Sequence, residues 1–297
     1  MTSQTSISLP AVEPTRRSPG LAAQFRRQFI RNRGGMIGLA IMVTITLIAI
    51  FAPLVSPYDP YALSRLDRLQ GPSRAHLMGT DDLGRDLLSR IIYGARISMT
   101  VGLFTVLIAT ALGTPAGIVA GYFGGKIDSL IMRVMDVIFS FPAVLLALAI
   151  TAFLGPNLRN MILALGIVYA PGFSRIVRGP VLAARHLEYV EASRVMGASN
   201  ARILVHHLLP NIISPLIVTA TVTFSFALLA EAALSFLGMG AQPPEASWGV
   251  MLSSGRRFME TVPSLAVFPG LAIMITVLAS NLLGDALRDV LDPRLRR

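Results

Sequence analysis

Long stretches without a charged side chain constrain this sequence more than any other feature. A helix needs roughly 20 apolar residues to cross the hydrocarbon core of a bilayer. Five such stretches, free of Asp, Glu, Lys and Arg, cover residues 34–58, 97–125, 137–158, 212–230 and 261–284. A sixth and shorter one, residues 160–174, ends at Arg175. The sequence therefore predicts an all-α, polytopic membrane protein with six transmembrane helices.

The composition agrees with a membrane protein and excludes several other classes. Of the 297 residues, 53% are hydrophobic and 14% are charged, which is too apolar for an ordinary soluble surface. The absence of cysteine excludes disulfides, thiolate metal sites and cysteine nucleophiles. A net charge of +10 is compatible with nucleic-acid binding, but the basic residues flank the apolar stretches, which membrane topology explains better. We expect contact with membrane lipid and none with nucleic acid.

Arginines near the ends of the stretches predict the orientation, because cytoplasmic loops carry the excess of basic residues. Ten lie near the two termini: Arg16, Arg17, Arg26, Arg27, Arg31, Arg33, Arg288, Arg294, Arg296 and Arg297. Five more lie in the loop of residues 175–211. We therefore expect both termini and this loop on the cytoplasmic side of a bacterial inner membrane. Residues 1–34 then form a basic N-terminal segment, and residues 35–297 form the six-helix transmembrane domain.

The external segment, residues 56–96, is long enough to carry structure of its own. Its second half predicts an amphipathic helix with Thr80 as the N-cap. Two aspartate–arginine pairs have the i,i+4 spacing of ion pairs on a helix surface: Asp81/Arg85 and Asp86/Arg90. We interpret these aspartates as ion-pairing residues, with a cation site or a catalytic carboxylate pair as the alternative. Trp248, in the second external loop, is interpreted as an interfacial anchor, with contact to an external partner as the alternative.

Ionisable residues near or within the predicted spans are candidates for a transport pathway, because charged groups in spans usually face the bundle interior or water. Arg133 and Asp136 lie one turn apart near the cytoplasmic end of the third span, so they are able to neutralise each other. Pro142, after Phe141, is expected to kink this span. Glu231 is expected near the outer surface, some twenty residues into the fifth span. A structural ion pair is the alternative interpretation for Arg133 and Asp136.

The loop of residues 175–211 contains the most informative pattern. Residues 187–196 favour a short helix, and Gly197 is the residue that caps a helix most easily in the left-handed conformation. Ser199 is expected to cap a second helix, and Pro210 to break the chain before the fifth span. We call residues 187–210 the knob, because two short helices across a turn form a projection suited to a groove on another protein.

The spacing of the knob resembles the EAA loop of ABC-importer permeases, in which Glu-Ala-Ala, Gly, Ile and Leu-Pro follow at fixed intervals. The matching residues are Glu191, Ala192, Ser193, Gly197, His207, Leu209 and Pro210. Ser193 replaces the usual third Ala, and His207 replaces the usual Ile, as in the dipeptide/oligopeptide/nickel branch. Residues 76–90, 234–238, 247–249 and 281–294 resemble the same branch, and the chain is similar to a permease of the DppC/OppC type.

This resemblance implies a type I ABC-importer permease fold and a set of partners. It implies a heterodimer with a homologous second permease, in which each chain forms half of the translocation pathway. Two cytoplasmic ATP-binding subunits and an extracytoplasmic substrate-binding protein complete the expected assembly. The helix ending at Gly197 would be the coupling helix, with Glu191 at the ATPase contact. Di- or oligopeptides are the implied solutes, with a nickel chelate or a glutathione-like compound as the alternative.

The chain itself is not expected to be an enzyme. Its nearest approach to a phosphate-binding loop, Gly124-Gly125-Lys126-Ile127, lacks the leading glycine and has Ile where Ser or Thr is needed. We therefore expect no cofactor or metal in this chain, and ATP and Mg on the partner ATPases. A stand-alone carrier driven by an ion gradient is the remaining alternative, although the sequence shows no internal repeat of the kind many such carriers have.

Overall fold

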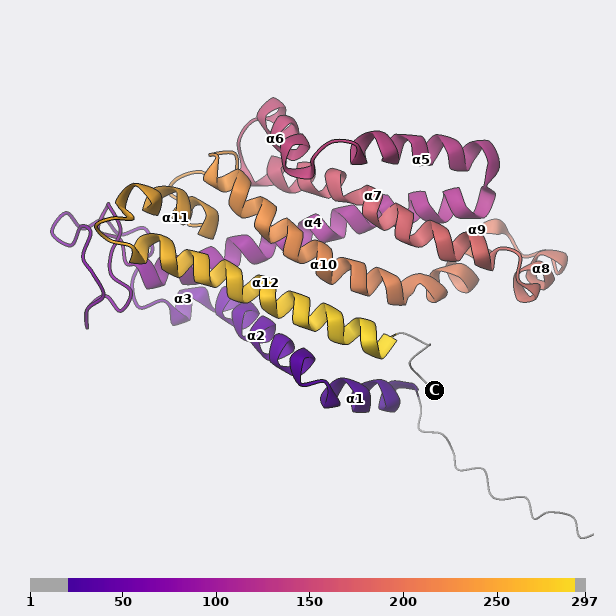
Figure 1. The fold of residues 1–297 in the computed structure, drawn as a ribbon, viewed down its shortest axis with the longest axis horizontal. Coiled ribbons are helices and arrows are strands. Elements are labelled where there is room, and N and C mark those ends of the chain that lie inside the picture. The colour runs from indigo at the N-terminus through magenta and orange to yellow at the C-terminus, as the bar shows by residue number, and fades with distance from the viewer. Residues whose placement is uncertain (1–20, 292–297) are drawn as a thin grey trace, which may run out of the picture.

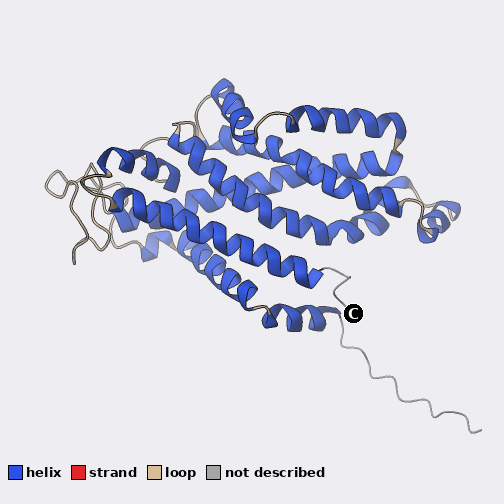
Figure 2. Cartoon of the chain, viewed as in Figure 1, coloured by secondary structure: helices blue, strands red, loops and turns tan. Residues whose placement is uncertain are grey.

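The computed structural model describes the backbone of residues 21–291 and the side chains from residue 26 onward. Over this range the chain is a bundle of helices that run along the long axis of the molecule (Figures 1 and 2). The described chain contains no β-strand, and one isolated β-bridge joins Thr80 to Asp86. Several arginines of the predicted topology lie outside the described residues: Arg16, Arg17, Arg294, Arg296 and Arg297.

Six of the described helices are short, and the others are longer. The short helices are α1 (Leu21–Arg31), α3 (Ala52–Val55), α6 (Ala143–Leu154), α8 (Glu188–Val195), α9 (Asn200–Ile203) and α11 (Trp248–Gly255). The longer helices are α2 (Arg33–Ile50), α4 (Leu87–Phe123), α5 (Gly125–Phe139), α7 (Leu158–Ala184), α10 (Leu209–Phe236) and α12 (Ser264–Leu291). A π-helical turn, η1 (Leu204–Leu208), joins α9 to α10, and a 3₁₀ turn, η2 (Arg256–Phe258), follows α11.

The prediction of six spans is confirmed, with one span broken. Five segments of the described chain are long and apolar enough to cross a membrane: α2, α4, α7, α9 to α10, and α12. The sixth consists of α5 and α6, which meet at an angle of 89°. Pro142 immediately precedes α6, and a proline disfavours helical backbone at the residue before it. The kink expected at this proline is therefore a complete break between two helices.

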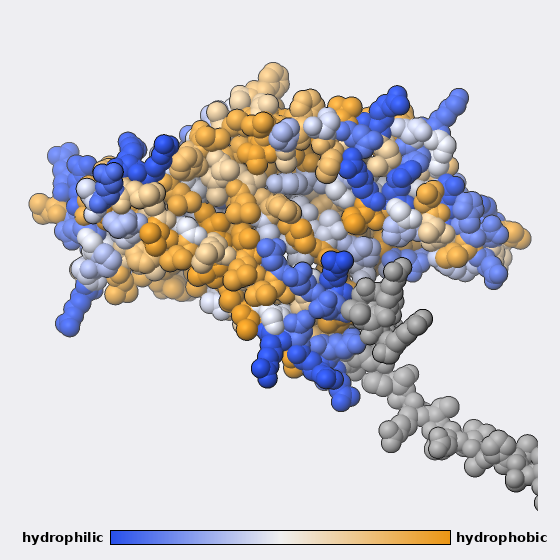
Figure 3. All heavy atoms as spheres, in the orientation of Figure 1, coloured by the Kyte–Doolittle hydropathy of each residue, from blue (hydrophilic) through white to orange (hydrophobic). Residues whose placement is uncertain are grey.

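The surface divides into an apolar middle and two polar ends. Figure 3 shows hydrophobic side chains over the central part of the visible face, with hydrophilic side chains gathered towards the ends. Large aliphatic side chains on the outer faces of the spans are exposed, for example Leu47 at 48% and Leu278 at 54%. An apolar belt between polar ends is the surface that a bilayer requires.

Helices α4 and α7 meet backbone to backbone in the middle of the bundle. A Cβ atom on Gly113 would lie 2.2 Å from the carbonyl oxygen of Ala170, and one on Gly117 would lie 2.3 Å from that of Ser174. These two glycines are four residues apart and share one face of α4. Small residues at this spacing allow membrane helices to approach closely, where van der Waals packing holds them together.

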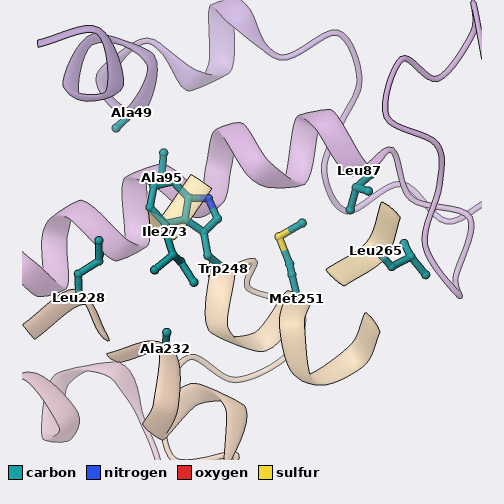
Figure 4. Packing of buried hydrophobic residues seen from close by; sticks show 9 residues of the cluster. All are labelled: Ala49, Leu87, Ala95, Leu228, Ala232, Trp248, Met251, Leu265 and Ile273. Carbon is teal, nitrogen blue, oxygen red and sulfur yellow. The ribbon is translucent and has the colours of Figure 1, made fainter. Parts of the chain in front are cut away.

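The end of the bundle that carries α3 and α11 has its own apolar core (Figures 1 and 4). Trp248, on α11, packs in it against α4, and its indole nitrogen donates a hydrogen bond to the carbonyl of Ile91 at 3.0 Å. Only 2% of Trp248 is exposed. The interpretation of Trp248 as an interfacial anchor is therefore wrong. This tryptophan holds α11 on the long helices. The same burial excludes the alternative, a contact between this side chain and an external partner.

The helix predicted from Thr80 begins later, at Leu87, and forms the start of the α4 span. The carboxylate of Asp81 accepts backbone N–H groups from Leu83 and Arg85, at 2.9 and 3.0 Å. This local turn competes with helical backbone. Asp86 is the observed N-cap, and its carboxylate accepts the N–H of Ser89 at 2.8 Å.

Of the two ion pairs predicted in this segment, one is confirmed and one is wrong. Arg85 donates to Asp81 at 2.7 Å, as expected. Arg90 turns to the same aspartate, at 3.4 Å, instead of to Asp86. Asp86 is 2.9 Å from the Nδ1 atom of His76. Because residues 81–86 are not helical, the i,i+4 spacing does not bring Asp86 and Arg90 together.

The close contact between α4 and α7 generates a stability prediction. We expect Gly117→Ala to lower the free energy of unfolding by about 1–3 kcal/mol, because the added methyl group meets backbone that has no room to move. Gly172→Ala, on α7, is the matched control, since nothing lies within 4 Å of its Cβ position. Thermal unfolding of the purified protein in detergent measures both variants. Equal midpoints for the two would contradict the packing described here.

Candidate coupling knob and translocation surface

The knob predicted from the sequence lies at one end of the bundle, where α8 projects beyond the long helices (Figure 1). Helix α8 ends at Val195, and Gly197 follows with a φ of 81°, a conformation that glycine adopts without steric cost. The hydroxyl of Ser199 then caps α9 by accepting the N–H of Arg202 at 3.4 Å. The helix end at Gly197 and the helix cap at Ser199 therefore both form as predicted.

One face of α8 is exposed and partly apolar. Glu191 and Ala192 are both exposed, while 88% of Val195 and 80% of Met196 are accessible. Exposed aliphatic residues at the tip of a polar projection are typical of a surface that docks on another protein. Sequence reasoning missed Val195 and Met196, although two apolar residues directly before a helix-ending glycine are a readable signal.

The two departures from the usual EAA pattern meet inside the knob. The Ser193 hydroxyl donates to the carbonyl of Tyr189 at 2.7 Å and lies 3.4 Å from the Nε2 atom of His207. The Tyr189 hydroxyl in turn accepts a hydrogen bond from the side chain of Asn211 at 2.9 Å. Ser193 and His207 therefore join α8 to the start of the fifth span, and they do so beneath the exposed face.

The chain does not break at Pro210, contrary to the prediction. The helical path runs from Asn200 to Phe236 without interruption, and Pro210 lies in the first turn of α10. The π-helical turn η1 directly precedes α10. A wider turn at this point accommodates a residue that has no N–H to donate. Leu209 and Pro210 thus lie within the continuous helical segment that joins the knob to the fifth span.

A tyrosine at the end of α4 connects this helix to the knob. The hydroxyl of Tyr122 donates to the Asn200 side chain at 2.7 Å and accepts from Arg194 at 3.4 Å. The guanidinium of Arg194 also lies over the Tyr122 ring, 5.7 Å from its centroid. We call these three residues the Tyr122 clasp. Sequence reasoning missed it, because nothing local indicates that residues 72 or more positions apart meet.

Helices α5 and α7 enclose a charged cleft near the knob end of the bundle. Arg178 binds Asp128 with two hydrogen bonds of 2.6 Å, a geometry that makes ion pairs strong. Arg175 binds Asp136 at 2.6 Å. Asp136 therefore pairs across to α7, and the predicted neutralisation by Arg133 on its own helix is wrong. Together with Ser129 and Met132, these five residues line a cleft of about 490 Å³.

An apolar cavity adjoins the same helices where the third span is broken. Its volume is about 670 Å³, and its lining comes from the end of α5, the start of α6, α7 and α10. Phe141 and Pro142, both pathway candidates, lie on its wall with Phe139 and Tyr169. Arg133 and Asp136, the other two candidates on this span, lie in the charged cleft. Four of the five predicted pathway residues thus line two volumes bounded by α5 and α7.

Glu231 lies apart from both volumes. It is fully buried, with 0% of its surface exposed. Its carboxylate accepts hydrogen bonds from the hydroxyls of Ser235, at 2.8 Å, and Ser98, at 3.1 Å. Ser98 belongs to α4 and Glu231 to α10, so the carboxylate joins these two spans through polar contacts inside an apolar bundle.

Two known families match the chain. A family described as the binding-protein-dependent transport system inner membrane component matches residues 113–297. A second, described as the N-terminal TM domain of oligopeptide transport permease C, matches residues 20–72. The first match contains the cleft, the cavity and the knob, and the second contains α1, α2 and α3.

Curated relatives match over nearly the whole chain. A dipeptide transport system permease protein of Alkalihalophilus pseudofirmus is 46% identical, over 99% of this chain and 99% of the relative. A di/tripeptide transport system permease protein of Pseudomonas aeruginosa is 44% identical, with 97% of each covered. A glutathione transport system permease protein of Pectobacterium atrosepticum is also 44% identical, over 92% of this chain and 91% of the relative.

A solved structure shares the fold at low sequence identity. It is an inward-facing conformation of the MetNI methionine ABC transporter, which aligns with a TM-score of 0.57 at 20% identity. The alignment covers 69% of this chain and 97% of that chain. The fold is therefore that of an ABC-transporter permease, as expected.

The environment of Glu231 predicts a structural role. We expect Glu231→Ala to lower the free energy of unfolding by about 2–4 kcal/mol, since it leaves two buried serine hydroxyls without their acceptor and opens a cavity. Glu231→Gln keeps the shape and an acceptor oxygen, and is expected to lose less than half as much. Thermal unfolding in detergent compares the two variants. An alanine variant as stable as the wild type would contradict this role.

Proposed function

The chain belongs to the family of binding-protein-dependent transport system inner membrane components, and on that premise we propose that it forms half of the translocation pathway of an ATP-driven peptide importer. Family membership makes it an ABC importer permease of the peptide type. The apolar cavity and the charged cleft support a role in the pathway, because residues of α5 and α7 line both of them. A homologous second permease would cover these surfaces and supply the other half.

The knob is proposed to dock on a cytoplasmic ATP-binding subunit and to receive its conformational change. The observation that carries this proposal is the exposed tip formed by Glu191, Val195 and Met196, beyond the ends of the spans. The continuous helix behind it joins the tip to the fifth span, and the Tyr122 clasp joins it to α4. A movement of the tip would therefore be transmitted to two spans, the fifth span and α4. On this proposal ATP and Mg are bound by two partner subunits, and both termini share the cytoplasmic side with the knob.

Short peptides are the proposed solutes. Relatives of similar identity are named for dipeptide, di/tripeptide and glutathione transport, and all three solutes are small and contain peptide bonds. The apolar cavity of about 670 Å³ is large enough for a small solute, on the scale of ordinary ligand pockets. A glutathione-like compound is the alternative within this class. An extracytoplasmic binding protein is the expected source of the solute.

Reconstitution tests the proposed function. The chain, its second permease and both ATP-binding subunits are assembled in liposomes, with the binding protein and labelled dialanine outside. We expect uptake that requires enclosed ATP and every subunit, because on this proposal the partner subunits bind ATP and this chain forms only half of the path. A proton or sodium gradient without ATP is the control. Gradient-driven uptake by the isolated chain would establish a stand-alone carrier and overturn the proposal.

Two separate glycines with positive φ, Gly197 and Gly125, allow a controlled test of the coupling role. Gly197→Asp places a charged side chain at a backbone φ of 81°, inside the knob. We expect uptake to fall roughly tenfold relative to ATP hydrolysis, within the usual range for coupling between two sites. Gly125→Asp is the matched control, because its φ of 55° carries a similar strain outside the knob. Uptake per ATP is the measured ratio, and full coupling in the Gly197 variant would refute the assignment.

A further inference from the structure

The face that α5 and α7 present to their surroundings carries exposed charged side chains on two candidate spans. Helix α5 buries none of its residues within the described chain. The side chains of Asp136 and Arg175 are 59% and 40% exposed, and Arg133 is exposed on the same face. A charged side chain in lipid costs about 2.5–3.5 kcal/mol or more near the bilayer centre. Charged side chains in spans usually face the bundle interior or water, so we expect this face to meet water or protein and not lipid tails.

The charges on this face do not cancel. Three arginines and two aspartates line the cleft, and the aspartates are both engaged by arginines of α7. Among the described residues, no acidic side chain lies within ion-pair distance of Arg133. The cleft thus keeps a surplus of one positive charge, which raises the local concentration of anions, most strongly where water is confined.

The charged cleft and the apolar cavity meet at one pair of side chains. The guanidinium of Arg175 lies over the ring of Phe139, 4.0 Å from its centroid. Phe139 lines the apolar cavity, whereas Arg175 lines the cleft. A solute that leaves the cavity towards the knob end therefore passes this stacked pair and then Arg133.

From these three observations, and resting on the proposed function, we propose that the cleft is the water-filled exit of the translocation path, where Arg175 and Arg133 bind the carboxylate of the departing solute. In the structure, Asp136 forms an ion pair with Arg175. A solute carboxylate competes with Asp136 for this guanidinium, and Arg133 supplies the charge that makes the exchange favourable. Asp128 and Arg178 stay paired with two hydrogen bonds and hold α5 against α7 while this happens.

A single introduced thiol tests the inference, because the chain has no cysteine of its own. Ser129 lines the cleft one helical turn before Arg133, so a Ser129→Cys variant reports the charge at this point. The complete complex, in nanodiscs of zwitterionic phosphatidylcholine, is treated with an anionic sulfonate or a cationic trimethylammonium methanethiosulfonate. Both reagents are membrane-impermeant, and a lipid without net charge removes anionic lipids as a source of the effect. The two labelling rates are normalised to those of free 2-mercaptoethanol.

We expect the Ser129→Cys thiol to react with both reagents and to prefer the anionic one. Adding Arg133→Gln is expected to lower the normalised anionic-to-cationic ratio roughly threefold or more, because the Coulomb energy of a nearby positive charge has opposite sign for the two reagents. Leu130→Cys is the matched control on the next residue, 68% exposed but outside the cleft. It is expected to react slowly with both reagents, because lipid covers it.

Two results would overturn the inference. A Ser129→Cys thiol that neither reagent reaches would mean that protein or lipid fills the cleft. A rate ratio that Arg133→Gln leaves unchanged would mean that the surplus charge does not act there. Uptake of dialanine by the same complex tests the proposed function separately. A complex that imports the dipeptide but shows no charge preference in the cleft contradicts the exit site alone, whereas a complex that fails to import contradicts the proposed function.

Discussion

The knob end of the molecule depends on the close contact between α4 and α7. Because Gly113 and Gly117 carry no side chain, these two helices meet backbone to backbone. The contact fixes the end of α4, where Tyr122 reaches the knob, relative to α7, which leads into the knob. Helix α5 begins a single residue after α4 ends. The contact between α4 and α7 therefore also sets the distance between α5 and α7. A wider spacing would separate both the Tyr122 clasp and the ion pairs of the charged cleft.

Local signals in the sequence predicted the parts of the fold that local physics determines. Uncharged apolar stretches predicted the spans, because a helix satisfies its backbone hydrogen bonds within one segment inside a bilayer. Gly197 and Ser199 predicted the turn in the knob, since each acts on its own backbone neighbours. The family resemblance predicted the permease fold. Functional roles for Glu191 and the other knob residues remain predictions, because the structure shows where they lie and not what binds them.

Two of the failures have the same physical cause, which is that a contact between distant residues leaves no mark in local spacing. Asp136 was expected to pair with Arg133 but binds Arg175, 39 positions away, because a facing helix offers a better approach. Trp248 was expected at a membrane interface but donates to the carbonyl of Ile91. At Pro210 the expected break is replaced by a π-helical turn, a local solution that the proline alone does not specify.

We propose that the tip of the knob transmits conformational change between an ATP-binding subunit and the spans. A cross-link at Met196 tests it most directly, since this side chain is exposed and the chain offers no competing thiol. In a complex carrying Met196→Cys, a short bifunctional maleimide should join this chain to an ATP-binding subunit with one introduced thiol, and should stop ATP-driven uptake. Failure to form the cross-link at any position tried on the ATP-binding subunit, or uptake at the wild-type rate after complete cross-linking, would contradict this role.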